Sequence, residues 1–305
     1  MSGNNVLNSV HGILLVDKPL GQSSNKTLQQ VKSIFKAQKA GHTGNLDVLA
    51  SGLLPVCFGE ATKVSQFLLN ADKRYLAEFT LGRTTTTGDS EGEETSSPGF
   101  ELVETSSLVA AVKKLTGEIL QIPPMYSALK VEGKRLYSLA REGVEIEREE
   151  RAVTIFDFDI VEINFPLISV HVHCSKGTYI RVLAEDLGKL LGCGGYMSKL
   201  ERISSGPFKL ADAHSVDYLQ KFSDANGQDI LKGLLIKPDE ALKNLPEVGL
   251  TKPQVQALRF GQIISFGAGC VKGAIVRLYD QEQNFFGLGV VGEEGTIAPK
   301  RLFNL

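Results

Sequence analysis

The loop at residues 39–55, KAGHTGNLDVLASGLLP, places a single carboxylate, Asp47, among glycines and small polar residues. No other acidic residue occurs between Asp17 and Asp47. This isolation allows two interpretations. Asp47 is either a turn residue whose side chain bonds its own backbone beside Gly44 and Asn45, or a nucleophile or acid/base group.

The same acid-free stretch is rich in lysine: Lys18, Lys26, Lys32, Lys36 and Lys39. Nearby positive charge favours the ionised form of a carboxylate, and it draws polyanions towards the surface. These lysines lack acidic partners three or four residues away, which is unusual for a surface helix stabilised by ion pairs. They form either a phosphate-binding face or the solvated face of a helix.

Several other side chains could take part in chemistry or binding. His42, between Gly41 and Gly44, is either a structural loop histidine or an exposed ring able to stack on a base. Tyr75 and Tyr179 are, taken alone, ordinary aromatic residues of a strand and of a helix start.

Two further patterns concern charge. Arg181 lies in the first turn of an expected helix, where the helix dipole disfavours a cation, so a carboxylate or phosphate partner is expected. His171 and His173 share one strand face, as two metal ligands would, but no third ligand is suggested, and a solvated face is favoured. No nucleotide fingerprint or cofactor motif occurs.

The elements that must position these residues alternate between strand and helix patterns. A buried strand is expected from Gly12 to Pro19, followed by a helix capped by Ser23 or Ser24. LISVHVHCS alternates apolar and polar residues as a half-buried strand does, and a helix follows it. Residues 84–99 are polar and acidic, which predicts a surface loop.

Strands joined too tightly for parallel crossovers predict an α+β fold with a mixed, mostly antiparallel central sheet. Short glycine-rich strand patterns from about Leu250 predict a small C-terminal β-barrel, after a linker at residues 243–249.

Composition limits the classes of protein. The 305 residues are 42% hydrophobic and 22% charged, with a net charge of −2, as expected for one large or two smaller globular domains. No secretory signal or membrane span is recognisable. The four cysteines fit no zinc pattern and indicate a reducing compartment. A cytoplasmic protein is expected.

Five motifs, taken in order, resemble the family of bacterial tRNA pseudouridine synthases of the TruB type. The similarity extends from about Gly12 to Leu305 and covers almost the whole chain. The motifs are GILLVDKPLGQSSN, AGHTGNLDVLASGLLPVCFGEATK, DKRY, PPMYSALKVEGKRLYSLAREG and KGTYIRVLAEDLG. This resemblance implies conversion of a uridine in the T-loop of tRNA to pseudouridine, without metal or organic cofactor.

The resemblance also implies roles for individual residues. Asp47 corresponds to the catalytic aspartate, and Arg181 is its expected ion-pair partner, which would lower its pKa. His42 would fill the space left by a flipped base, on which Tyr75 would stack. Pocket walls would come from Tyr179, Leu200 and Lys18.

Two positions of the loop depart from the family pattern. Asn45 stands where the family usually has a small residue, and Val48 stands where proline usually follows the aspartate. Proline would fix φ and stiffen the turn, so the rigidity of this loop needs another source.

The implied organisation is a catalytic domain at residues 1–245 and an RNA-binding domain of the PUA type at residues 250–305. Residues 124–152 would form a segment that clamps the T-arm, while the second domain holds the acceptor end of the tRNA. We expect a monomer that needs no protein partner and no membrane.

Two other functions remain open from the sequence. The protein could be a folding factor that opens and refolds tRNA, with or without the chemistry. It could also be a guide-RNA-dependent relative that acts on ribosomal RNA.

Overall fold

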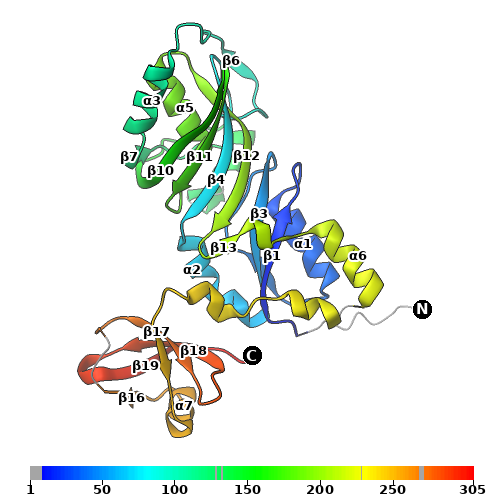
Figure 1. Ribbon diagram of the computed structural model, residues 1–305, viewed down its shortest axis with the longest axis vertical. Coiled ribbons are helices and arrows are strands. Elements are labelled where there is room, and N and C mark those ends of the chain that lie inside the picture. The colour runs from blue at the N-terminus through cyan, green and yellow to red at the C-terminus, as the bar shows by residue number, and fades with distance from the viewer. Residues whose placement is uncertain (1–8, 128, 132, 228, 268–270) are drawn as a thin grey trace.

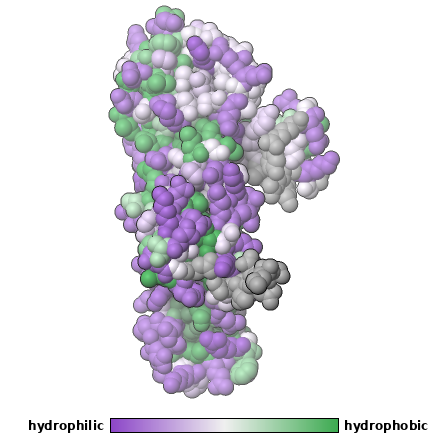
Figure 2. Space-filling model, turned by 90° about the vertical axis from the view of Figure 1, so that its right-hand side faces the viewer, coloured by the Kyte–Doolittle hydropathy of each residue, from purple (hydrophilic) through white to green (hydrophobic). Residues whose placement is uncertain are grey.

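The computed structural model describes residues 9–127, 129–131, 133–227, 229–267 and 271–305. It contains two larger sheets, one in the upper body of the molecule and one at the C-terminal end (Figure 1). Hydrophilic residues cover much of the face shown in Figure 2, and hydrophobic residues appear there in small patches. Among the described helices, none is both long enough and apolar enough to cross a membrane.

The large sheet has ten strands, and its hydrogen bonds are mostly antiparallel. The exceptions are the parallel pairs β1–β14 and β3–β12. In spatial order the main path is β14 (His214–Ser215), β1 (Gly12–Lys18), β3 (Ala50–Phe58), β12 (Gly195–Ser205), β4 (Lys73–Leu81), β11 (Leu167–Cys174), β10 (Arg151–Asn164) and β7 (Gly117–Gln121), while β2 (Ala40–His42) pairs with β3 and β13 (Phe208–Lys209) with β12. The predicted α+β fold with a mixed, mostly antiparallel sheet is confirmed.

Helices cover this sheet through two separate clusters of apolar side chains. One cluster joins α3 (Thr105–Lys114) and α5 (Ile180–Leu191) to β4 and β11. The other joins α1 (Ser24–Ile34) and α6 (Val216–Asn226) to β1 and β3. In β11 the predicted alternation is confirmed, because the side chains of Ile168, Val170, Val172 and Cys174 are buried.

The remaining elements are short. Two helices, α2 (Ser65–Asn70) and α4 (Leu136–Arg141), have six residues each. Two small hairpins lie outside the main sheets: β5 (Thr84–Thr85) pairs with β6 (Glu94–Ser96), and β8 (Lys130–Val131) pairs with β9 (Lys134–Arg135). Short 3-10 helices connect larger elements; these are η1 (Gly59–Val64), η2 (Leu210–Asp212), η3 (Asp229–Leu234), η4 (Pro238–Leu242) and η5 (Glu293–Gly295).

The C-terminal sheet has five strands and curls into a half-barrel, which agrees with the predicted β module. Helix α7 (Lys252–Arg259) begins with a capping box formed by Thr251 and Gln254. The strand order is β15 (Glu247–Gly249), β17 (Ile275–Tyr279), β18 (Phe285–Val291), β19 (Thr296–Leu302) and β16 (Ile264–Ser265).

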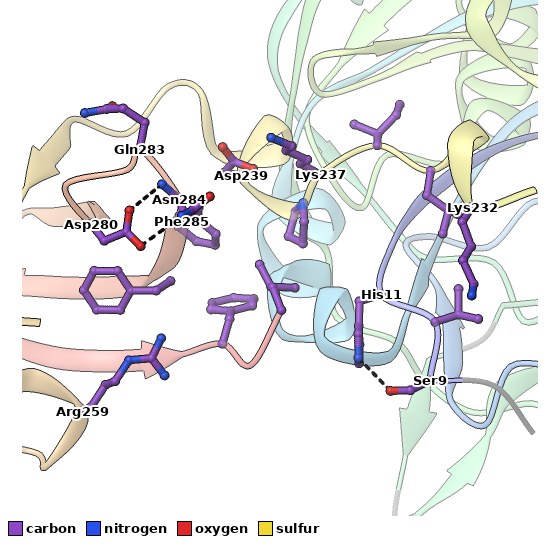
Figure 3. Close-up of a pocket in the computed structure, with 17 residues that line it drawn as sticks. Ser9, His11, Lys232, Lys237, Asp239, Arg259, Asp280, Gln283, Asn284 and Phe285 are labelled. Carbon is purple, nitrogen blue, oxygen red and sulfur yellow. Dashed lines mark hydrogen bonds between the residues drawn. The ribbon is translucent and has the colours of Figure 1, made fainter. Parts of the chain in front are cut away.

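The C-terminal end of the chain is docked on the body of the protein. Lys63 Nζ donates to the Leu302 carbonyl over 2.7 Å, and the Asn304 amide donates to Glu60 over 2.8 Å. A cavity of about 730 Å³ lies at this junction, lined by residues such as His11, Asp239 and Asp280 (Figure 3). Its lining is separate from the residues around Asp47.

Candidate active site

Asp47 lies in a cavity of about 390 Å³ formed by the loop before β3, by β4 and β12, and by the start of α5. The structure brings five of the predicted site residues to its wall: Asp47, Tyr75, Tyr179, Arg181 and Leu200. The Asp47 side chain is 35% exposed, so its carboxylate can be reached from the cavity.

The loop that carries Asp47 is held by its main chain. The Ser24 hydroxyl accepts from the Leu46 amide over 2.8 Å and donates to the Leu46 carbonyl over 3.0 Å. The Gly21 amide donates to the Val48 carbonyl over 2.9 Å. Because these contacts are made on both sides of Asp47, the loop has a source of rigidity that does not depend on proline at position 48.

Arg181 holds the Asp47 carboxylate, as predicted. Its Nε lies 3.2 Å from Asp47 Oδ2, and its Nη1 lies 3.3 Å from Asp89 Oδ2. Nη2 donates to the Tyr126 carbonyl over 2.8 Å. The guanidinium is buried and held by a fixed set of acceptors. It therefore keeps the Asp47 carboxylate in one position, unlike a mobile ion pair on the surface. The alternative that Asp47 is a simple turn residue is not favoured by this geometry.

Asp89 is a site residue that the sequence pattern missed. Residues 84–99 predicted a surface loop, but the Asp89 side chain is only 3% exposed. Its Oδ1 accepts from the Thr87 hydroxyl over 2.5 Å and from the Glu91 amide over 3.1 Å. The polar composition of the loop hid this burial. The one sequence feature that pointed towards a buried acid was Arg181 in the first turn of a helix, which called for an anionic partner.

Arg181 lowers the pKa of Asp47, as predicted, but the net shift of that pKa is upward. Burial raises the pKa of Asp47 above its ordinary value, and Asp89 raises it further, while Arg181 and Lys18 oppose that shift. The Asp47 side chain is partly buried, and the desolvation of its carboxylate outweighs the ion pair. Without Arg181, the pKa of Asp47 would therefore be higher still.

The two tyrosines are set by neighbouring elements. Tyr75, on β4, is buried, and burial raises its pKa to about 12. Tyr179 precedes α5, where its amide donates to Gln121 Oε1 over 3.0 Å and its carbonyl accepts from Gln121 Nε2 over 3.3 Å. Gln121 is buried at the end of β7, so it fixes the start of the helix that carries Arg181.

Lys18 and His42 lie outside the cavity wall. Lys18 is fully buried behind it, where Nζ donates to the carbonyls of Pro19 and Gln22, and burial lowers its pKa to about 8. Of the two interpretations of His42, a structural histidine or an exposed ring, full exposure is not observed: it is half-buried at the end of β2, paired with Val56 of β3. The strand pairing that draws it inward could not be read from its glycine neighbours.

The two histidines of β11 lie next to carboxylates of the adjacent strand β10. In the part of the chain that the structure describes, His, Cys, Asp and Glu side chains form no group of three or more that could hold a metal ion. His173 Nδ1 instead lies 3.1 Å from Asp157 Oδ2 of the adjacent strand.

Known proteins resemble this chain over nearly its full length. The model of the TruB family pseudouridylate synthase N-terminal domain matches residues 32–180, and C-terminal models of the same family match residues 181–243 and 246–303. The tRNA pseudouridine synthase B of Methylobacillus flagellatus is 48% identical over 302 residues, which are 99% of this chain and 98% of that protein. This chain belongs to the TruB family.

Other relatives of this TruB-family chain agree with that assignment. The tRNA pseudouridine synthase B of Actinobacillus pleuropneumoniae is 43% identical, over 97% of each chain. A chain in the crystal structure of a Cbf5-Nop10-Gar1 complex is 26% identical with a TM-score of 0.73, over 96% of this chain and 85% of that chain. A chain of an archaeal box H/ACA sRNP Nop10-Cbf5 complex has a TM-score of 0.72 at 25% identity, over 98% of this chain and 88% of that chain.

The site of this TruB-family protein is thus a small chamber in which a carboxylate, a buried arginine and two tyrosines converge. A planar ring fits such a chamber between aromatic and aliphatic walls. The carboxylate at its floor can act as a nucleophile or as a base once it is ionised.

Proposed function

We propose that this protein isomerises a uridine in the T-loop of tRNA to pseudouridine, with Asp47 as the catalytic group. The observation that carries the proposal is the pairing of Asp47 with the buried Arg181 inside a cavity that Tyr75 and Leu200 also line. The relatives named tRNA pseudouridine synthase B support tRNA as the substrate.

The size of the cavity supports base flipping. At about 390 Å³ it can hold one nucleotide but no paired or stacked helix. A target uridine must therefore leave its stack to reach Asp47, as in other enzymes that act on a base. Tyr75 offers an aromatic face to the extruded ring, and Tyr179 and Leu200 complete the wall.

The chemistry requires the ionised form of Asp47. Isomerisation breaks the bond between N1 and C1′ and joins C1′ to C5 of the same ring, while the hydrogen of C5 leaves to solvent as a proton and N1 takes up a proton. Attack at C1′, attack at C6 and removal of the 2′ proton all begin from a carboxylate rather than a carboxylic acid. Arg181 supplies the charge that keeps this form accessible in a desolvated site.

The rest of the chain provides the RNA-binding surface. We assign catalysis to residues 1–245, the clamp on the T-arm to residues 124–152, and acceptor-end binding to residues 250–305. His42 and Lys18, which lie near the cavity but outside its lining, would support the flipped state and the wall. The protein would act as a monomer in the cytoplasm, without guide RNA or protein partners.

Release of tritium from tRNA labelled at uridine C5 tests the proposal directly. Purified protein alone should release tritium from a T-arm hairpin, and Asp47→Asn should reduce the rate by at least about 1,000-fold. A requirement for added RNA or protein would contradict stand-alone action. Full release by Asp47→Asn would show that the catalytic assignment is wrong.

A second measurement separates catalysis from a folding-factor function. Asp47→Asn should still bind tRNA, because the change removes a negative charge from the cavity and no RNA-facing cation. If refolding of misfolded tRNA is retained by this variant, the protein has a folding activity independent of the chemistry. If refolding is lost with catalysis, that function is not independent.

A further inference from the structure

Arg202, on β12, is a buried cation that the reaction scheme above does not use. Its side chain is 1% exposed, and arginine is rarely buried unless it is paired. Among the residues that the structure describes, no carboxylate lies within ion-pair distance of Arg202. Because burying an unpaired charge is costly, its neutral partners must compensate for the lost water.

Those partners belong to the catalytic loop and to the strand behind it. Arg202 Nε donates to the Leu53 carbonyl over 2.7 Å. Nη1 and Nη2 donate over 3.4 Å to the carbonyls of Asn45 and Gly44. These two carbonyls lie just before Asp47, so the guanidinium joins the catalytic loop to β3.

A further neighbour of the guanidinium is the Tyr75 hydroxyl. Tyr75 and Arg202 are directly opposite each other on the paired strands β4 and β12, and their side chains interact. A guanidinium only donates hydrogen bonds, so it can approach the phenol favourably only at its oxygen. Both residues line the cavity.

The backbone around Arg202 is built for close approach. Gly52 of β3 has φ of +98°, and a Cβ there would come within 2.5 Å of the Arg202 carbonyl oxygen. Only glycine allows strands β3 and β12 to meet so closely at this point. This close approach lets the side chain of Arg202 reach the main chain of the loop that carries Asp47.

We propose that Arg202 is a positioning residue for the isomerisation, which holds the Tyr75 hydroxyl and the Gly44–Asn45 backbone in one arrangement around the substrate base. This inference rests on the proposed function. Its geometric basis is the rigid fork of arginine, which reaches several acceptors at once, whereas lysine presents its donors from one point.

Single-turnover tritium release with enzyme in excess tests this role. Arg202→Met should slow isomerisation about 100-fold, since a small misplacement of reacting groups costs that much, while the Kd for tRNA changes less than about threefold. Arg202→Lys should recover only part of the rate, although it restores the charge. Full recovery by lysine would contradict the geometric argument.

Coupling to Tyr75 separates positioning from general support of the fold. The loss caused by Arg202→Met should be at least about tenfold smaller in a Tyr75→Phe background, because residues that act through one another are not additive. Losses that multiply fully would overturn the inference. Leu219→Ala, a buried change in α6, should lower the Tm because it leaves a cavity in the core, without this loss of rate.

Two outcomes remain distinct in this design. If the wild-type protein releases no tritium from tRNA, the proposed function fails. If the wild type is active and the Arg202 losses multiply with those of Tyr75→Phe, only the positioning role fails. Should Arg202→Met not fold, Arg202→Lys carries the same coupling measurement.

Discussion

Asp47 and Asp89 bind the same guanidinium, at 3.2 Å and 3.3 Å from two nitrogens of Arg181. One buried cation thus compensates for two carboxylates, of which only Asp47 reaches the cavity. Asp89 anchors Arg181 from behind and at the same time raises the pKa of Asp47 through its negative charge. The balance between these groups sets the pH range in which Asp47 is ionised.

Replacing Asp89 by asparagine should move the acid limb of the single-turnover rate profile to lower pH. The change removes a charge that raises the pKa of Asp47, so the carboxylate should stay ionised to lower pH. The maximal rate should fall about tenfold or more, because Arg181 loses an anchor. Glu93→Gln, an exposed change in the same loop, should leave the profile in place.

Replacing Lys18 by methionine should shift the same limb in the opposite direction. Lys18, with a pKa of about 8, is protonated throughout the acid range, and its charge lowers the pKa of Asp47. Removing it should raise that pKa and move the limb to higher pH, as measured by tritium release against pH. An unchanged limb would show that the two groups do not interact, and Lys209→Met on the surface provides the comparison.

Asp47→Asn should not lower the stability of the protein at about pH 7. The pKa of Asp47 is raised in the folded state. Below its ordinary pKa the carboxyl is protonated in both states and does not oppose folding, and this stability is lost as the pH rises through the folded-state pKa. The ionised carboxylate therefore opposes folding at neutral pH, as at many active sites. Thermal unfolding should give an equal or higher Tm for the variant, with the difference shrinking at acid pH. A clearly lower Tm at neutral pH would mean that the attraction between Arg181 and the Asp47 carboxylate exceeds the desolvation cost of that carboxylate.

Ser24→Ala tests how the loop stays rigid without proline at position 48. The change leaves the Leu46 amide and carbonyl without their hydroxyl partner, at a cost of about 1–3 kcal/mol, and the isomerisation rate should fall as well. Ser23 is the matched control, because its hydroxyl caps α1 by accepting from the Lys26 amide. Ser23→Ala should cost about 1 kcal/mol of stability but keep the rate. Equal rates for both variants would argue against the loop contact.

The lysines of α1 and the turn after it should contribute to tRNA affinity. Among the ion pairs of the described residues, none includes Lys26, Lys32, Lys36 or Lys39. If they contact phosphates, changing all of them to glutamine should reduce the slope of log Kd against log salt by about 0.7–0.9 per lysine in contact. Lys113 and Lys114, at the exposed end of α3, offer a control pair. An unchanged slope would identify the α1 face as solvated surface.

The local elements and the chemical identity of the site were accessible from the sequence. Alternating residues predicted β11, the serine pair predicted the start of α1, and the acid-free stretch singled out Asp47. An arginine in the first turn of α5 predicted a carboxylate or phosphate partner, and its partners are the carboxylates of Asp47 and Asp89. These signals depend on neighbours a few residues apart, and such spacing survives in a linear pattern. The domain division at residues 245–250 stays a prediction.

Tertiary structure alone decided what surrounds the carboxylate. Asp89 comes from a polar loop and Arg202 from a distant strand, and no spacing in the sequence relates either of them to Asp47. The burial of Asp47, which reverses the expected direction of its pKa shift, likewise results from the packing of β3, β4 and β12. Side-chain desolvation depends on atoms brought together by the fold, so the sequence determined which groups are present while the structure determined how strongly each holds its proton.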